Sequence, residues 1–144
     1  MLRTWLALAA IAVGSYLLIH FFVTTDRERV ERQVERLAEL ARLGGEDAAE
    51  EFLLAFADDY RGSIDRKRIE RYVRRHVGGG TVRSLKLGSF KTIVVPDDGE
   101  IVVPLLLVTA ELDDWTTRLL LTLTWAERNG VWRIVRASRA KWGS

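Results

Sequence analysis

The pattern of apolar and polar positions begins with one long apolar stretch and continues with segments of helical and then alternating periodicity. No charged side chain falls within residues 4–23, between Arg3 and Asp26. A helix of about twenty residues, at about 1.5 Å per residue, covers roughly 30 Å, the thickness of the hydrocarbon core of a bilayer. The pattern therefore predicts a single-pass transmembrane helix at residues 4–23, within an anchor of residues 1–25.

Two other interpretations of this stretch are a cleavable signal peptide and a buried core helix. The apolar run is longer than a signal-peptide h-region, and no small-x-small cleavage site follows it. A core helix of this length is unusual in so small a chain. Four basic residues after the stretch favour a cytoplasmic domain: Arg27, Arg29, Arg32 and Arg36. The short N-terminal tail is instead typical of a signal anchor. We expect a cell-membrane protein with an extracytoplasmic domain.

Helical periodicity continues in three segments after the apolar stretch. Residues 26–43 repeat apolar side chains at helical spacing, which predicts a juxtamembrane stalk or coiled coil, or else the first helix of the domain. Gly44 and Gly45 end this segment. Residues 46–60 and 65–77 predict two further helices, and Asp65 is the expected N-cap of the second.

From residue 81 the period changes to two, which predicts four strands: 81–95, 101–112, 115–127 and 131–140. Gly88 predicts a bulge or bend, and Pro104 predicts an edge strand or an irregular one. Two-residue turns at residues 113–114 and 129–130 fix the register, with these opposing pairs: Trp125 and Ile134, Glu127 and Trp132, Leu106 and Leu121, Val108 and Leu119. One face, expected to pack on the helices, then collects Val102, Pro104, Leu106, Val108, Ala110, Leu119, Leu121, Leu123, Trp125, Trp132 and Ile134.

Helices followed by long antiparallel strands form an α+β arrangement. Residues 128–134, Arg-Asn-Gly-Val-Trp-Arg-Ile, resemble the final hairpin of the nuclear transport factor 2-like (NTF2-like) superfamily, also called SnoaL-like or cystatin-like. In that group a polar turn with Gly precedes a Trp-x-Ile strand. The resemblance implies an NTF2-like α+β domain at 46–144, after a juxtamembrane helix at 26–45. Its three helices would pack on a four-stranded antiparallel sheet and form a cone.

No position matches the catalytic motif of that superfamily, so we expect no catalytic residue and no cofactor. The predicted register places Arg136 and Ser138 on the apolar face with Trp125. There Arg136 either binds a carboxylate or phosphate, or reaches water beside a helix carboxylate. Trp115 and Tyr72 complete the candidate ligand-binding set.

Four other polar residues lie near helix ends, where they either meet at the mouth of the cone as an acid–base site or form a solvated turn and a surface helix C-terminus: Asp58, Asp59, Tyr60 and His76. The two histidines, His20 and His76, lie far apart in the chain and predict no metal site. The absence of cysteine excludes disulfides, thiol catalysis and cysteine-based zinc sites.

The charged residues are unevenly distributed, although the formal net charge is only +2. A basic run follows the acidic segment 46–59: Arg66, Lys67, Arg68, Arg71, Arg74 and Arg75. It predicts either a surface for anionic lipid or an acidic partner, or a solvated face paired with the acidic segment. Nucleic acid is not expected, because the run lacks interleaved aromatic residues apart from Tyr72. The sequence favours a non-catalytic assembly module with a protein partner or a second copy. A small-molecule binder or enzyme that uses the cone is the alternative.

Overall fold

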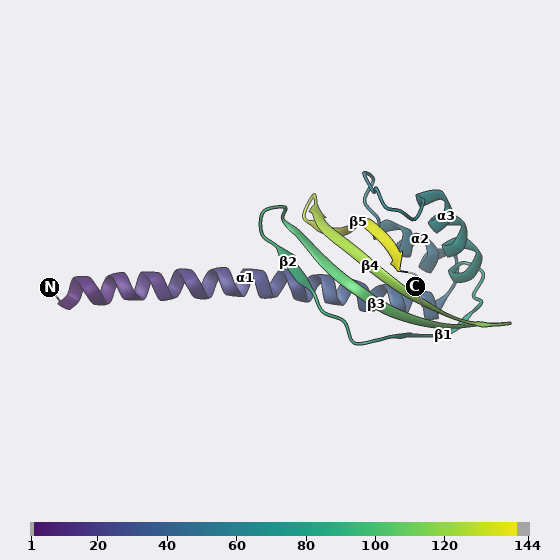
Figure 1. Ribbon diagram of the computed structural model, residues 1–144, viewed down its shortest axis with the longest axis horizontal. Coiled ribbons are helices and arrows are strands. Elements are labelled where there is room, and N and C mark those ends of the chain that lie inside the picture. Colours follow the sequence, from purple (N-terminus) through teal and green to yellow (C-terminus); the bar gives the residue numbers. More distant parts are fainter. Residues whose placement is uncertain (1, 141–144) are drawn as a thin grey trace.

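The computed structural model describes the backbone of residues 2–140 and the side chains of residues 3–17 and 26–140. A long helix projects from a body in which a curved sheet faces short helices (Figure 1). The elements in chain order are α1 (Leu2–Leu43), α2 (Glu46–Leu54), α3 (Arg66–Tyr72), the π-helical turn η1 (Val73–Val77), β1 (Val82–Leu87), β2 (Ile93–Val95), β3 (Glu100–Leu112), β4 (Thr116–Arg128) and β5 (Val131–Ala140).

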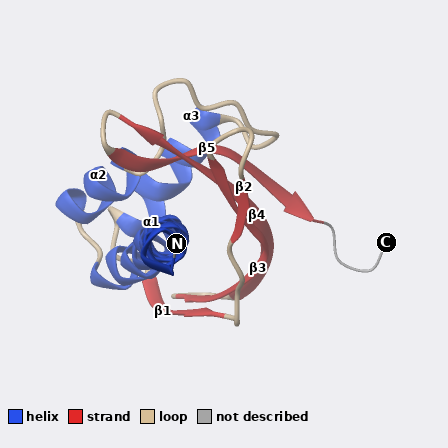
Figure 2. Cartoon of the chain, turned by 90° about the vertical axis from the view of Figure 1, so that its left-hand side faces the viewer, coloured by secondary structure: helices blue, strands red, loops and turns tan. Residues whose placement is uncertain are grey.

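The predicted anchor and the predicted helix at 26–43 form one continuous helix, α1. Its C-terminal half belongs to the hydrophobic core, where Val30 is 0% and Leu40 is 2% exposed. Figure 2 shows the sheet curving around this helix. The Arg27 guanidinium donates to the hydroxyl and the carbonyl oxygen of Thr92, at 3.0 and 2.6 Å, and ties α1 to the segment before β2. This part of α1 therefore packs as the first helix of the domain.

The described residues contain no helix that combines the length and the apolar character needed to cross a membrane. The predicted span at residues 4–23 falls partly outside the described residues, because the side chains of residues 18–25 are not among them.

The second predicted helix, at residues 46–60, ends earlier than the sequence pattern indicated. α2 stops at Leu54, and the chain after it binds β5. The Ile134 N–H donates to the Ala55 carbonyl at 2.7 Å, and the Ala57 N–H donates to the Ile134 carbonyl at 2.9 Å. These tertiary hydrogen bonds replace those of a further helical turn, so local helical periodicity did not decide this boundary.

The third predicted helix, at residues 65–77, is present but changes its hydrogen bonding midway, from α3 to η1. The Gly78 N–H donates to the Val73 carbonyl, five residues earlier, at 2.9 Å. Asp65 occupies the N-cap position of α3, as predicted, but its side chain makes no capping hydrogen bond.

The sheet is antiparallel and five-stranded, with the order β1-β3-β4-β5 and β2 also paired with β3. The single strand predicted at 81–95 is therefore two strands. Gly88 follows β1, where its N–H donates to the Leu107 carbonyl at 2.8 Å. A Cβ at Gly88 would lie 3.1 Å from the Leu107 Cβ, so the close approach of the two strands favours glycine here.

All four opposing pairs predicted from the turns are present in the sheet. The register shifts between Val103 and Leu106, which confirms the irregularity predicted at Pro104. The shift reverses the face of the residues that precede it. Ile101 and Val103 are buried there. The prediction that Val102 and Pro104 lie in the core was wrong.

A second irregularity lies in β5, where Thr124 pairs with Arg136 but Trp125 pairs with Ile134. One extra residue, Val135, is thus accommodated in β5. Every later side chain moves to the opposite face from that predicted. Ala137 is buried in the core, whereas Arg136 and Ser138 are exposed. Their predicted place on the apolar face was therefore wrong.

Candidate functional site: an apolar cavity in the cone

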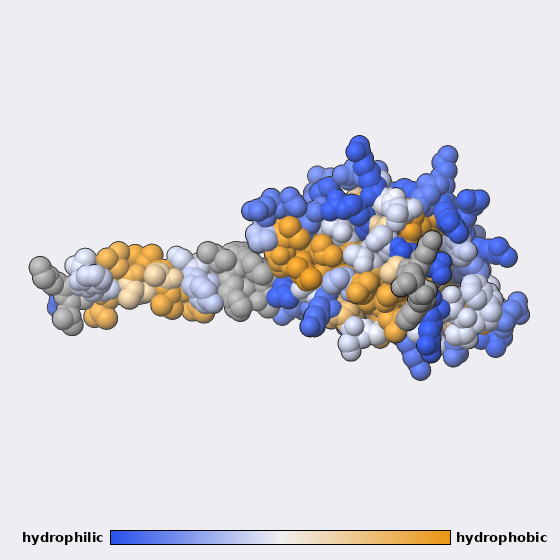
Figure 3. All heavy atoms as spheres, in the orientation of Figure 1, coloured by the Kyte–Doolittle hydropathy of each residue, from blue (hydrophilic) through white to orange (hydrophobic). Residues whose placement is uncertain are grey.

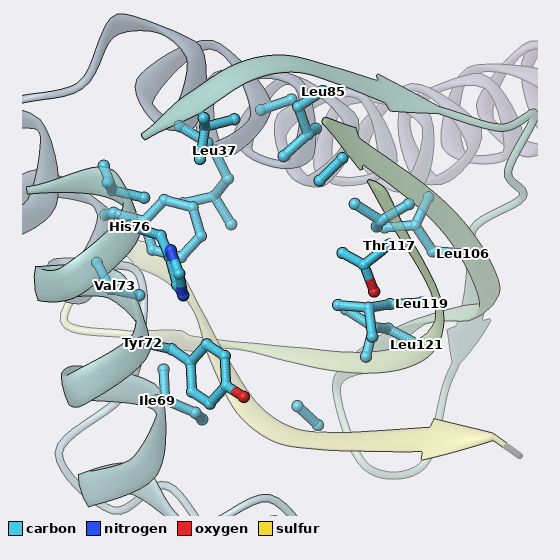
Figure 4. A pocket seen from close by; sticks show the side chains of 18 of the residues that line it. Leu37, Ile69, Tyr72, Val73, His76, Leu85, Leu106, Thr117, Leu119 and Leu121 are labelled. Atoms are coloured by element: carbon cyan, nitrogen blue, oxygen red, sulfur yellow. The ribbon is translucent and has the colours of Figure 1, made fainter. Parts of the chain in front are cut away.

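A cavity of about 490 Å³ lies between the sheet and the helices α1, α3 and η1. Ligand pockets in proteins typically measure about 300–1,000 Å³. Figure 4 shows one wall formed by α3 and η1 and a facing wall formed by the sheet. The labelled side chains of the two walls point toward the same space: Ile69, Tyr72, Val73 and His76 on the helical wall, and Leu106, Thr117, Leu119 and Leu121 on the sheet.

The cavity results from the curvature of the sheet around α1. β-Bulges bend the strand that carries them and increase its twist. β3 and β5 both contain a register shift, and the sheet that they belong to wraps around α1 in Figure 2. On the helical side, α1 contributes the apolar side chains of Val34, Leu37 and Ala41. The result is a space enclosed largely by apolar groups.

Six lining residues carry a polar side-chain group: Arg68, Tyr72, His76, Trp115, Thr117 and Arg139. No aspartate or glutamate is among the described residues that line the cavity. General acid–base chemistry needs titratable groups that converge on a substrate, and among the described lining residues the imidazole of His76 and the phenol of Tyr72 are of the types used for it.

His76 is the most constrained of these polar residues. Its Nδ1 lies 3.1 Å from the Thr81 hydroxyl, and that hydroxyl donates to the His76 carbonyl at 3.3 Å. The hydroxyl oxygen thus accepts from Nδ1, and the neutral ring keeps Nε2 as an acceptor. Burial, with a smaller contribution from the charge of Arg75, lowers the pKa of His76. The imidazole is consequently neutral at pH 7, beside the Tyr72 ring at a centroid distance of 5.5 Å.

The structure separates the candidate ligand-binding set predicted from the sequence. Tyr72 and Trp115 line the cavity. Trp125 is fully buried in the core, at 0% exposure, and does not line it. Arg136 and Ser138 lie on the outer face of β5, where the Arg136 guanidinium donates to the Glu100 carboxylate at 2.6 Å. Arg136 is therefore paired on the outside of the sheet and does not reach the cone.

The polar residues weighed near the helix ends have mostly structural contacts. The Asp59 carboxylate pairs with Arg128 at 3.1 Å, which lowers the pKa of Asp59. The Tyr60 hydroxyl donates to the Ile64 carbonyl at 2.9 Å, and desolvation raises the pKa of Tyr60. Neither residue lines the cavity, whereas His76 does.

Three further cavity residues were missed by sequence reasoning: Arg68, Thr117 and Arg139. Arg68 was recognised only as part of the basic run. Simple alternation from Ile134 places Arg139 on the outer face, and only knowledge of the extra residue in β5 would have reversed that placement. No signal in the sequence marks that residue.

The basic run forms an exposed surface on α3 and η1. Lys67, Arg68, Arg71, Arg74 and Arg75 are all exposed. Within the described part of the chain, Arg66 pairs with Glu70, and no member of the run forms an ion pair with α2. The pairing predicted between this run and the acidic segment is thus absent there. In Figure 3 the surface above α3 is hydrophilic.

No family model matches the sequence, and no curated protein matches it either. Solved structures do resemble the fold. An NTF2-like protein with a cystatin-like fold from Novosphingobium aromaticivorans is 18% identical, with a TM-score of 0.66 over 89% of this chain and 90% of that chain. A putative scytalone dehydratase from the same species is 13% identical, with a TM-score of 0.62 over 82% and 86%.

A third structure, Bd1075 of Bdellovibrio bacteriovorus, is 12% identical, with a TM-score of 0.63 over 81% of this chain. The match covers 41% of the Bd1075 chain, so this chain spans about two fifths of that protein. Identities this low establish the fold alone. The chain therefore has an α+β, NTF2-like fold, as the resemblance of residues 128–134 implied.

Proposed function

We propose that the protein is a membrane-anchored NTF2-like domain whose cone binds an apolar small molecule. The observation that carries the proposal is the 490 Å³ cavity with its largely apolar walls. An apolar ligand in such a cavity exchanges contact with water for contact with apolar side chains, which is favourable. The absence of a carboxylate among its described lining residues favours binding over catalysis.

Binding is tested by equilibrium dialysis of dodecanol against the full-length chain in phosphatidylcholine nanodiscs, with empty nanodiscs subtracted. Leu119→Trp places a larger side chain in the cavity, because Leu119 points into it from β4 (Figure 4). Leu120→Trp, on the other face of the same strand, is the matched control. We expect saturable binding by the wild type and Leu120→Trp, and its loss in Leu119→Trp. Equal uptake by all three would contradict the proposal.

The anchor is proposed from residues 4–23, which lack charge, together with the environment of the described side chains in α1. The N-terminal half of α1 extends away from the domain, and its described surface is rich in apolar groups (Figures 1 and 3). Large apolar side chains stand exposed along it, including Trp5 at 73%, Leu6 at 64% and Ile11 at 66%. Burying these side chains in lipid is favourable, whereas exposing them to water is not.

Alkaline carbonate extraction of membranes tests the anchor. Ile11→Arg places a charge near the middle of the proposed span, which costs about 2.5–3.5 kcal/mol on insertion scales. We expect the wild type to stay in the membrane pellet and Ile11→Arg to be partly released. Leu43→Arg, at a site 72% exposed at the end of α1, is the control and should stay in the pellet. Complete release of the wild type would refute the anchor.

We also propose that the domain lies on the extracytoplasmic side of the cell membrane. The chain contains no cysteine, so Ser138→Cys introduces a single thiol at an exposed site. A membrane-impermeant maleimide should label this thiol in intact cells. Labelling only after lysis would place the domain in the cytoplasm.

A second candidate function is assembly with an acidic protein partner, which the exposed basic residues of α3 and η1 favour. Five exposed cations without an ion pair to α2 form a field that attracts acidic surfaces. The test is native mass spectrometry of complexes extracted at low salt. We expect a subunit of defined mass that is lost in Arg71→Gln/Arg74→Gln. An unchanged monomer in both proteins would remove this candidate.

A further inference from the structure

The exposed and buried residues that line the cavity differ in chemistry. The residues in its interior are apolar, apart from Thr117 and the neutral His76. Four lining residues are exposed, and we call them the rim. Two lie on α3, one in the β3–β4 turn and one on β5: Arg68, Tyr72, Trp115 and Arg139. The rim therefore combines two guanidinium groups and two aromatic rings around an apolar interior. Figure 1 places α3 and the β3–β4 turn, which carries Trp115, at the end of the domain remote from the N-terminus.

The two rim arginines lack the carboxylate partner that several other arginines of the domain have. Arg36, Arg83, Arg128 and Arg136 each lie within 4.0 Å of a carboxylate. Within the described part of the chain, neither the Arg68 nor the Arg139 guanidinium forms a hydrogen bond or an ion pair. No described carboxylate lines the cavity beside them. Their hydrogen-bond donors are thus available to an oxyanion.

We infer that the ligand is a single-chain amphiphile with an anionic oxyanion head, of the fatty-acid type. Its hydrocarbon tail occupies the apolar interior, and its head lies at the rim beside Arg68 and Arg139. Guanidinium groups bind carboxylates through charge-assisted hydrogen bonds. A neutral apolar ligand would leave this part of the rim unused. The inference rests on the proposed function, because it assigns a ligand class to the same cavity.

The test compares dodecanoate with dodecanol, which share a chain length and differ in the charge of the head. Both are dialysed against the full-length chain in phosphatidylcholine nanodiscs at about pH 8, where the carboxylate is ionised. The test variant is Arg68→Gln/Arg139→Gln, which removes both rim charges from exposed sites. The matched control is Arg71→Gln/Arg74→Gln, which removes two exposed charges that do not line the cavity.

We expect the wild type to bind dodecanoate at least about tenfold more tightly than dodecanol, as charge-assisted hydrogen bonds imply. The rim variant should lose this preference and keep its affinity for dodecanol. The control variant should keep the preference. Thermal unfolding of each variant, followed by tryptophan fluorescence, checks that the fold is intact.

Three results would overturn the inference. Equal affinities for dodecanoate and dodecanol in the wild type would refute the anionic head and leave the proposed function standing. An equal loss of preference in both double variants would assign the effect to the general basic surface and not to the rim. If neither ligand bound saturably, the proposed function would fail together with the inference.

Discussion

Leu40→Ala tests whether the C-terminal half of α1 is part of the domain core. Leu40 is 2% exposed and belongs to the main hydrophobic cluster, which also contains Leu37 and Trp132. Truncation of a buried leucine leaves a cavity and typically costs about 2–5 kcal/mol of unfolding free energy. We place Leu40→Ala in the middle of that range, because the site is enclosed by α1, α2 and the sheet.

Leu43→Ala is the matched control, since it makes the same change in the same helix at a side chain that is 72% exposed. Alanine is a good helix former, so helix propensity does not oppose either variant. The control should change the unfolding free energy by no more than about 0.5 kcal/mol. Urea unfolding of the full-length chain, followed by the fluorescence of the buried tryptophans, measures both values. Equal effects of the two variants would show that residues 26–43 form a separate stalk, and would refute the packing described here.

Three other changes follow from the structure. Arg136→Ala should leave ligand binding unchanged and lower the unfolding free energy by at most about 1 kcal/mol, because Arg136 pairs with Glu100 on the outer face of the sheet. Because the folded-state pKa of His76 lies below its ordinary value of 6.5, the stability that its neutral form contributes should be full above about pH 6.5 and decline as the pH falls below it. His76→Gln should remove this part of the pH dependence. Gly62→Ala should destabilise the domain by about 1–3 kcal/mol, because its Cβ would lie 2.7 Å from the Ala137 carbonyl oxygen.

Urea unfolding measures all three variants, and dodecanol dialysis adds the ligand affinity of Arg136→Ala. A loss of ligand binding in Arg136→Ala would return Arg136 to the cone and contradict the register of β5. An unchanged pH profile in His76→Gln would show that burial of the imidazole does not affect stability. Ser63→Ala is the control for Gly62→Ala, because its hydroxyl makes only a 3.4 Å contact with the same carbonyl. Equal stabilities of these two variants would contradict the close approach at Gly62.

The sequence predicted most of the fold because local signals agreed with tertiary structure over long segments. The Asn129-Gly130 turn fixed the β4–β5 register at Trp125 and Ile134, and the same reasoning held for β3 and β4. The helix boundary at Leu54 was not predictable from periodicity, since hydrogen bonds to a distant strand set it. Gly88 indicated a bend in one strand. In the structure one strand, β1, ends before Gly88 and a second, β2, begins after it.

The candidate site was predicted less well than the fold, and the register shifts are the reason. A single extra residue reverses the face of every later position in a strand. Val135 has this effect in β5, and it moved Arg136 out of the cone and brought Arg139 to its rim. A β-branched residue such as Val135, between Ile134 and Arg136, carries no mark of a bulge. Tyr72 and Trp115, two members of the candidate ligand-binding set, line the cavity, and neither lies after the register shift in β5.

The central claim is that the cone of this domain holds an apolar ligand. Native mass spectrometry tests it most directly, on the full-length protein extracted in mild detergent from its own membrane. We predict that the wild type and Leu120→Trp carry one bound small molecule per chain, and that Leu119→Trp, with its cavity filled, carries none. Bare chains in all three proteins, or the same bound mass in Leu119→Trp, would contradict the account.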